Sequence, residues 1–457
     1  MTDGRTVYSA SWVLPIAAPP FPDGAVCVDG GRIVLVGPVR DVLERAGTAR
    51  HVALGHAALL PGLVNAHSHL ELTAMRGFLE GLDFRDWLRT LTLARRDVMD
   101  ANALRDASRH GLVEALRHGI TTCADTAEST APLAAMHEMG MRGIGYLEVF
   151  GPDPALCDDA MDGLRERVAT ACAHDTVLVR TGVSPHAPYT VSASLFRAVA
   201  QYAHEHTLPV AVHIAESVAE VQFVRDGEGP FADRLRARGI AVAPQARTPI
   251  ALLHATGLLD VRPLLIHAVH VDDEDLTRVA ASGATIVHCP LSNAKLGQGV
   301  APLHRILDVG IPTGLGSDSV ASNDRMDLLS EARQATLLQA LTLQRPDALS
   351  AHAALELATR GGARALGLDD RIGTLEPGKD ADLAAFPLTQ PQAIPLFDPA
   401  VTLVHVLAGA ARASLVTVAG RELVRNGHVV TAPPGLDERM MILGERLTRW
   451  RAAHLTA

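Results

Sequence analysis

Cysteine is scarce in this chain of 457 residues, and its five cysteines are scattered. Their number is odd and no two of them form a C-x-x-C pair; they are Cys27, Cys123, Cys157, Cys172 and Cys289. This pattern argues against a disulfide framework and against a thiolate zinc site, and it fits a reducing compartment. A metal ion, if the protein binds one, would therefore be held by histidine and carboxylate side chains.

Long hydrophobic runs and concentrated positive charge are also missing. No eighteen consecutive residues are apolar, and the segment 1–5 does not begin a secretory signal. The net charge of −10 is modest for this length, and no basic stripe stands out, which argues against nucleic acid or a membrane as a partner. We therefore expect a cytoplasmic protein with a small-molecule substrate. The sequence leaves open whether it forms a homo-oligomer.

The middle of the chain repeats one pattern, a short apolar run that stops at polar residues and is followed by a segment with helical apolar spacing. The eight runs are 59–69, 119–125, 142–150, 179–186, 208–216, 263–271, 284–293 and 311–318. Eight strand–helix repeats predict a (β/α)8 barrel of the TIM type, whose active site forms at the carboxyl ends of the strands. A doubly wound open sheet is the alternative, but the Gly-rich phosphate turn usual after its first strand is missing.

The two flanks of the chain consist of short β-type runs separated by turns, and each is too small for a core of its own. We expect them to pair into one β-sandwich beside the barrel. The predicted division is 1–57 and 375–432 for the sandwich, 58–374 for the barrel and 433–457 for a C-terminal helix. The amphipathic pattern of that helix predicts packing against the barrel.

Two histidines separated by one residue, His67 and His69, end the first apolar run. Residues two apart in a strand point to the same side, so both imidazoles can approach one point. His213 and Asp318 end the fifth and eighth runs. Three histidines and an aspartate suit one divalent ion such as Zn²⁺ or Fe²⁺, with water completing the shell. Such an ion lowers the pKa of water to about 7, which favours a hydrolase.

The attack of that water also needs proton carriers. Glu216 follows His213 by three residues and can reach the same cavity without being a ligand. His267 can polarise the water, and Asp318 can both bind the metal and receive the water proton. Taken singly, these residues could be a helix charge, a core histidine and a cap residue. Their shared position at strand ends favours the catalytic interpretation.

Several segments carry a resemblance to a known family: 61–69 (PGLVNAHSH), 213–216 (HIAE), His267, 292–297 (SNAKLG), 315–323 (LGSDSVASN) and 373–383 (GTLEPGKDADL). They resemble the amidohydrolase superfamily, in particular its branch of nucleoside and heterocycle deaminases and triazine hydrolases. The resemblance implies that His67, His69, His213 and Asp318 bind one metal ion. It also implies that Glu216 and His267 serve the proton transfers.

The near absence of lysine bears on the number of metal ions. Two-metal members of this superfamily commonly bridge their ions with a carboxylated lysine from the fourth strand, and no lysine lies between His69 and His213. A lysine-bridged pair of ions is thereby excluded. A glutamate bridge through Glu148, at the end of the third run, stays open, but we expect a single metal ion.

The substrate is predicted only by class. Segments 67–71 and 184–192 together are similar to aminofutalosine deaminases, and segment 292–297 is similar to S-adenosylhomocysteine and methylthioadenosine deaminases. Both imply a 6-aminopurine nucleoside that releases ammonia. The alternatives are a triazine-type chlorohydrolase, a guanine, cytosine or pterin deaminase and, from another class, a barrel scaffold without activity. His186 is a candidate hydrogen-bonding contact to the substrate, and Trp87 could stack on the purine or pack the first helix.

Overall fold

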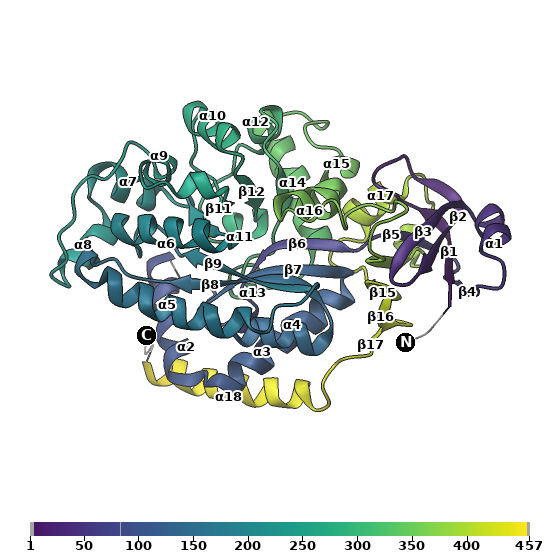
Figure 1. The fold of residues 1–457 in the computed structure, drawn as a ribbon, viewed down its shortest axis with the longest axis horizontal. Helices are drawn as coiled ribbons and strands as arrows, with labels where there is room; N and C mark the ends of the chain where they lie inside the picture. Colours follow the sequence, from purple (N-terminus) through teal and green to yellow (C-terminus); the bar gives the residue numbers. More distant parts are fainter. Residues whose placement is uncertain (1–3, 83, 455–457) are drawn as a thin grey trace.

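The computed structural model describes residues 4–82 and 84–454, so the outermost residues of both predicted end segments, 1–3 and 455–457, lie outside it. Parallel strands lie at the centre of the larger part of the molecule, with helices around them (Figure 1). These strands are β6 (Leu63–Ser68), β7 (Ile120–Ala127), β8 (Arg142–Val149), β9 (Val179–Pro185), β10 (Ala211–Ile214), β11 (Leu264–His267), β12 (Thr285–His288) and β13 (Thr313–Leu315).

These strands form a ring of two four-stranded sheets, β6-β7-β8-β9 and β10-β11-β12-β13. Parallel bridges close it between Val183 and Val210 on one side and between Ser68 and Asp318 on the other. Most strand residues are buried, as expected for a parallel sheet covered on both faces, and this explains the continuous apolar runs. The predicted (β/α)8 barrel is confirmed.

Helices cover the outside of the ring (Figure 1). Those before β10 are η1 (Leu70–Met75), α2 (Phe84–Val98), α3 (Ala101–Arg117), α4 (Ala131–Met139), η2 (Pro154–Leu156), α5 (Cys157–Cys172) and α6 (Ala193–His206). Those between β10 and β13 are α7 (Val218–Asp226), α8 (Pro230–Arg236), α9 (Pro249–Ala255), η3 (Leu258–Val261), α10 (Asp273–Ser282), α11 (Pro290–Lys295) and α12 (Leu303–Asp308). After β13 come α13 (Val320–Asn323), α14 (Leu328–Leu343), α15 (Ala351–Glu356), η4 (Leu357–Gly361) and α16 (Gly362–Ala365).

Two of the predicted runs are divided differently in the structure. The run 59–69 contains two strands, β5 (Ala57–Pro61) and β6, because the chain turns at Gly62, whose N–H donates to the Asp382 carbonyl. A Cβ at this position would lie 2.2 Å from the Thr121 side chain, so only glycine fits. The run 284–293 ends as a strand at His288, since Pro290 starts α11 with a residue suited to a first helical turn.

Both chain ends join in one nine-stranded sheet beside the barrel. Its order is β17-β16-β15-β14-β5-β1-β2-β3, with β4 paired to β1. Its strands are β1 (Thr6–Val13), β2 (Phe21–Asp29), β3 (Arg32–Pro38), β4 (Arg50–Ala53), β5, β14 (Leu383–Pro387), β15 (Leu415–Val418), β16 (Arg421–Arg425) and β17 (His428–Val429). Helices α1 (Val39–Ala46), η5 (Pro391–Ala393), α17 (Pro399–Val401) and η6 (Thr402–Val406) lie in its connections. The chain passes from this sheet to the barrel at Gly62; the predicted domain ranges stay a prediction.

A buried ion pair links the barrel to this sheet. The Arg142 side chain, 1% exposed, lies at the start of β8. Its Nε lies 2.8 Å from Asp382 and its Nη2 lies 2.8 Å from Asp380, in the segment that leads into β14. Because all three groups are buried, removal of one would leave an uncompensated charge.

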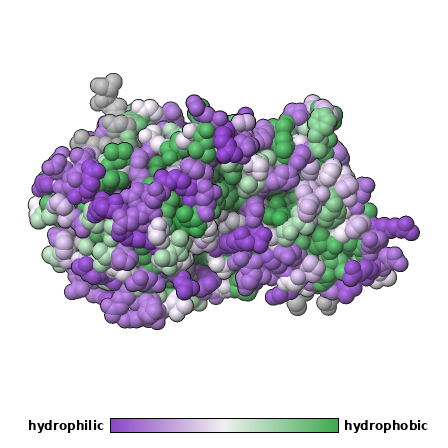
Figure 2. All heavy atoms as spheres, turned by 90° about the horizontal axis from the view of Figure 1, so that it is seen from above, coloured by the Kyte–Doolittle hydropathy of each residue, from purple (hydrophilic) through white to green (hydrophobic). Residues whose placement is uncertain are grey.

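The last helix, α18 (Leu436–His454), packs across α2 and α3 through Leu443, Leu447 and Trp450. Among the described residues, no helix is both long and apolar enough to cross a membrane. On the face drawn in Figure 2, hydrophilic side chains interrupt the apolar areas.

Candidate active site and metal centre

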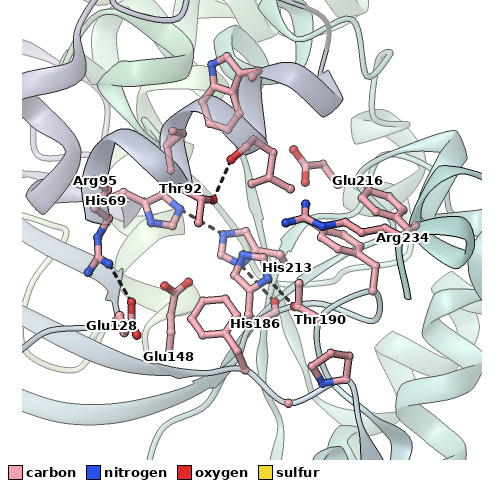
Figure 3. A pocket seen from close by; sticks show the side chains of 18 of the residues that line it. His69, Thr92, Arg95, Glu128, Glu148, His186, Thr190, His213, Glu216 and Arg234 are labelled. Atoms are coloured by element: carbon pink, nitrogen blue, oxygen red, sulfur yellow. Dashed lines mark hydrogen bonds and ion pairs between the residues drawn. The ribbon is translucent and has the colours of Figure 1, made fainter. Parts of the chain in front are cut away.

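A cavity of about 750 Å³ opens at the carboxyl ends of the barrel strands (Figure 3). Most of the residues proposed from the sequence line it: Trp87, His69, His186, His213, Glu216, His267 and Asp318. His67 lies beneath them and is 1% exposed. The barrel thus brings residues that are far apart in the sequence to the wall and floor of one cavity.

Three histidines and one aspartate converge on one point. The Nε2 atoms of His67 and His69 lie 3.3 and 3.5 Å from Asp318 Oδ1. The Nε2 atom of His213 lies 3.3 Å from that of His69. His67, His69 and His213 can each offer a ligand atom within 4.8 Å of the others, as can His67, His267 and Asp318.

These imidazoles are held in the neutral form. Burial lowers the pKa of His67 to about 4, and it also lowers the pKa values of His69 and His213. A neutral imidazole keeps a free lone pair, which is the form that binds a metal ion. Burial alone would raise the pKa of Asp318, but the nearby His67 outweighs burial and holds this pKa below its usual range.

The buried ring nitrogens of His67 are suited to binding a cation. Both of its ring nitrogens are buried, and neither has a hydrogen-bond partner among the described residues. An unsatisfied buried polar group costs about 1–3 kcal/mol, so this position favours a ligand for the ring. Histidine nitrogen and carboxylate oxygen are the donor set that zinc and similar ions prefer.

Hydrogen bonds from the β12 and β13 connections fix the Asp318 carboxylate. Ser292 and Ser322 donate their hydroxyl groups to Oδ2, and the Ser319 N–H donates to Oδ1 at 2.7 Å. Ser292 therefore supports Asp318 from the first turn of α11. The expectation that 292–293 would end a strand is wrong, because Pro290 has already begun the helix.

Glu216 and His267 lie side by side on the cavity wall. Their Oε1 and Nε2 atoms are 3.7 Å apart. Burial, helped by the Asp318 charge, raises the pKa of Glu216 to about 8. This carboxyl group can therefore hold a proton near neutral pH and exchange it with a molecule in the cavity.

A second glutamate, Glu220, holds this part of the chain in place. Its carboxylate accepts the N–H groups of Ala215, at 2.7 Å, and of Glu216, at 3.0 Å. Ala215 has a φ of 51°, in the left-handed region that is unfavourable for alanine, so these bonds stabilise a strained turn. Sequence reasoning missed Glu220, although the pattern Ser217-x-x-Glu220 is a helix-start signal that could have found it.

Glu148 and His186 form a further group with His213, with ligand atoms within 4.8 Å of one another. Glu148 Oε1 is buried without a partner among the described residues, and burial raises the pKa of this carboxyl. His186 Nδ1 lies 2.8 Å from the Thr190 hydroxyl, and its ring centroid is 4.8 Å from that of His213. His186 is thus placed next to His213 as well as on the cavity wall.

Trp87 lies on α2 with its indole at the cavity. Its ring stacks on Phe84 with centroids 6.2 Å apart, and its Nε1–H points to the Ala321 carbonyl at 3.4 Å. Trp87 therefore packs α2, as one interpretation expected, and it also lines the cavity; its stacking on a purine stays a prediction.

A barrel with buried neutral histidines and an ionised aspartate under an open cavity defines a metal-dependent hydrolase. Comparison with known proteins agrees, because residues 58–426 match the Amidohydrolase family. The chain belongs to this family. The predicted family, and with it an enzyme rather than a scaffold, is confirmed.

Individual relatives cover nearly the whole chain. It is 31% identical over 432 residues to a 5-methylthioadenosine/S-adenosylhomocysteine deaminase of Moorella thermoacetica, covering 94% of this chain and 96% of that protein. An adenosine deaminase from Xanthomonas campestris with bound zinc has a TM-score of 0.87 and 30% identity, covering 97% and 98% of the two chains. Atrazine chlorohydrolase from Arthrobacter aurescens, complexed with zinc, has a TM-score of 0.82 and 29% identity, covering 97% and 99%.

Proposed function

We propose that the protein binds one divalent ion, zinc, through His67, His69, His213 and Asp318. The observation that carries this proposal is the convergence of their donor atoms, in which His67 is buried without another partner among the described residues. The zinc in two similar structures supports the choice of ion. When bound, such an ion supplies a Lewis acid that activates water at neutral pH.

The reaction that this site supports best is hydrolytic deamination of a 6-aminopurine nucleoside. Water adds to the ring carbon that carries the amino group, the C–N bond breaks, and ammonia leaves. The curated relatives support this reaction, since their names give 5-methylthioadenosine and S-adenosylhomocysteine as substrates. The pairing of an aromatic wall at Trp87 with polar groups at the floor fits a planar base.

Two side chains would move the protons, and a third would hold the water. Asp318, kept ionised, accepts a proton from the attacking water. Glu216, with its raised pKa, donates a proton to a ring nitrogen and later to the departing amino group. His267 lies beside Glu216 and can hold the water by a hydrogen bond.

His186 and Trp87 are proposed as substrate contacts. His186 Nδ1 is engaged by Thr190, so its other nitrogen is the one available to a ring nitrogen or a ribose hydroxyl. The Trp87 indole can lie against the face of the base.

Displacement of another ring substituent, such as chloride from a triazine, is a second candidate. The likeness to atrazine chlorohydrolase supports it. Chloride departs without a proton, so this reaction would depend less on Glu216 than deamination does.

The test measures the ammonia and chloride that purified, zinc-loaded protein releases from a set of compounds. They are adenosine, methylthioadenosine, S-adenosylhomocysteine, guanine, cytosine, a pterin and atrazine. We expect ammonia from at least one of the adenine nucleosides and none from the Glu216→Gln variant. Chloride from atrazine without ammonia from any nucleoside would favour the second candidate. No product from any compound, with zinc bound, would overturn both.

A further inference from the structure

One face of the short helix α8 forms part of the cavity wall. Phe231, Arg234, Leu235 and, just beyond the helix, Arg238 line the cavity. Their spacing of three, four and seven residues is that of one helix face. This part of the cavity wall therefore contains two arginines, Arg234 and Arg238.

This helix is firmly held, so the backbone that carries Arg234 has a defined position beside the cavity. The Phe231 ring stacks on Tyr189, with centroids 4.0 Å apart and planes within 6°. Ala232 and Leu235 are buried in the main core. Tyr189 lies in the same loop as His186, so α8 is attached to the segment that carries a proposed substrate contact.

The guanidinium groups of Arg234 and Arg238 have no partner within the described residues. Neither side chain has an ion pair or hydrogen bond there, and both are exposed. By contrast Arg95, also in the cavity wall, lies 2.6 Å from Glu71 and 2.8 Å from Glu128. Figure 3 shows Arg95 directed at Glu128, and Arg234 directed into the cavity.

The cavity also has room for more than a base and a sugar. Its volume of about 750 Å³ lies in the upper part of the range for ligand cavities. Arg234 and Glu216 line the same cavity, so a substrate that reaches Glu216 with its base can reach Arg234 with a substituent.

We propose that Arg234, assisted by Arg238, binds an anionic group on the substrate and so selects nucleosides with an acidic substituent over neutral ones. A guanidinium offers two parallel N–H donors that match a carboxylate or phosphate. This inference rests on the proposed deaminase function and adds the substrate class to it. Arg234 acts on binding and takes no part in the proton transfers.

The experiment compares three substrates with the wild type and two variants. The substrates are methylthioadenosine, which has no charged substituent, S-adenosylhomocysteine, whose substituent carries a carboxylate beside an ammonium group, and adenosine 5′-monophosphate, which carries a phosphate. The variants are Arg234→Gln and the matched control Arg236→Gln. Arg236 lies on the same helix outside the cavity wall, and it donates to the Gly227 carbonyl at 2.7 Å. Both changes remove one charge from α8.

In Arg234→Gln we expect KM to rise about tenfold for an anionic nucleoside, which corresponds to about 1.4 kcal/mol, with kcat unchanged. KM for methylthioadenosine should stay unchanged, because this substrate has no anionic group for Arg234 to bind. A larger rise in KM for S-adenosylhomocysteine would identify the bound anion as a carboxylate. A larger rise for the monophosphate would identify it as a phosphate. An equal change for all three substrates, or the same selective change in Arg236→Gln, would overturn the proposal.

A direct measurement of binding can distinguish failure of the anion subsite from failure of the deaminase function. Calorimetric titration with S-adenosylhomocysteine and the monophosphate, in proteins that also carry Glu216→Gln, measures affinity without turnover. If no substrate releases ammonia, the proposed deaminase function is wrong. Weaker anion binding in Arg234→Gln, and not in Arg236→Gln, would still support the subsite. If ammonia is released and neither KM nor affinity depends on Arg234, only the subsite fails.

Discussion

The Nε2 atoms of His69 and His213 lie 3.3 Å apart, although His69 directly follows the first barrel strand and His213 lies in the fifth. Burial keeps both rings neutral. A cation bound by lone pairs that converge in this way favours the arrangement found in the folded state, so its binding stabilises the fold.

Removal of the metal by a chelator should therefore lower thermal stability as well as activity. A ligand at one hundred times its Kd adds about 2.7 kcal/mol to the free energy of unfolding. We expect a lower melting temperature after chelation and recovery on addition of Zn²⁺, measured by calorimetry. In His69→Ala the chelator should have no such effect. An unchanged melting temperature in the chelated wild type would contradict the proposed site.

Variants of Asp318 and Glu216 should distinguish metal binding from proton transfer. Each of the variants Asp318→Asn and Glu216→Gln should reduce kcat by at least about 100-fold, the usual range for loss of a positioned proton carrier. Only Asp318→Asn should lower the metal content, measured by elemental analysis. Full turnover in Glu216→Gln would show that its role is assigned wrongly.

The sequence predicted the barrel because each strand is buried on both faces and ends in polar residues. His67, His69, His213 and Asp318 could be found because they lie at strand ends, where topology brings them together. Ser292 was misplaced because a helix begins inside an apolar run. Arg234 was missed because it lies on a helix after β10, and an exposed arginine has no pattern that marks it as part of a cavity wall.

Arg142 should be essential for stability. The variant Arg142→Met leaves Asp382 buried without its partner, and we expect a loss of about 3–5 kcal/mol in the free energy of unfolding. Urea titration measures this. The control Arg345→Ala breaks the exposed pair with Asp347 and should change stability by less than about 1 kcal/mol. Equal effects would mean that burial of the Arg142 pair is unimportant.

The ion pair between Glu114 and Arg76 should make stability depend on pH. Burial raises the pKa of Glu114, but Arg76 outweighs it, so the pKa lies below its usual value of 4.5. A carboxylate with a lowered pKa stabilises the folded state above its unfolded pKa, and this contribution disappears as pH falls through the folded value. Glu114→Gln should thus be less stable than wild type at pH 7.

The difference between Glu114→Gln and wild type should shrink as the pH falls below about 4.5. Denaturant titrations across pH 3–7, an interval of about four units around that value, measure it. The variant Glu166→Gln, at an exposed position on α5, is the control and should give a constant, small difference. A difference for Glu114→Gln that does not vary with pH would contradict this assignment.

Trp450 on α18 should support the cavity from behind. Its indole N–H donates to Asp97 on α2 at 3.0 Å, and α2 carries Trp87. Trp450→Ala should cost about 3 kcal/mol of stability and raise KM, because α2 loses packing. Met441→Ala, on the exposed side of α18, should change neither. Loss of stability with an unchanged KM would show that α18 does not influence the cavity.

Strand β5 pairs with β1 on one side and with β14 on the other, and β14 follows the barrel in sequence. During synthesis the β5 edge next to the missing β14 therefore stays open until the ribosome has made the entire barrel. An open edge can pair with other chains. The nascent protein is consequently most exposed to aggregation before the last strands emerge, and truncations that remove β14 should accumulate as insoluble material even though they retain every proposed metal ligand.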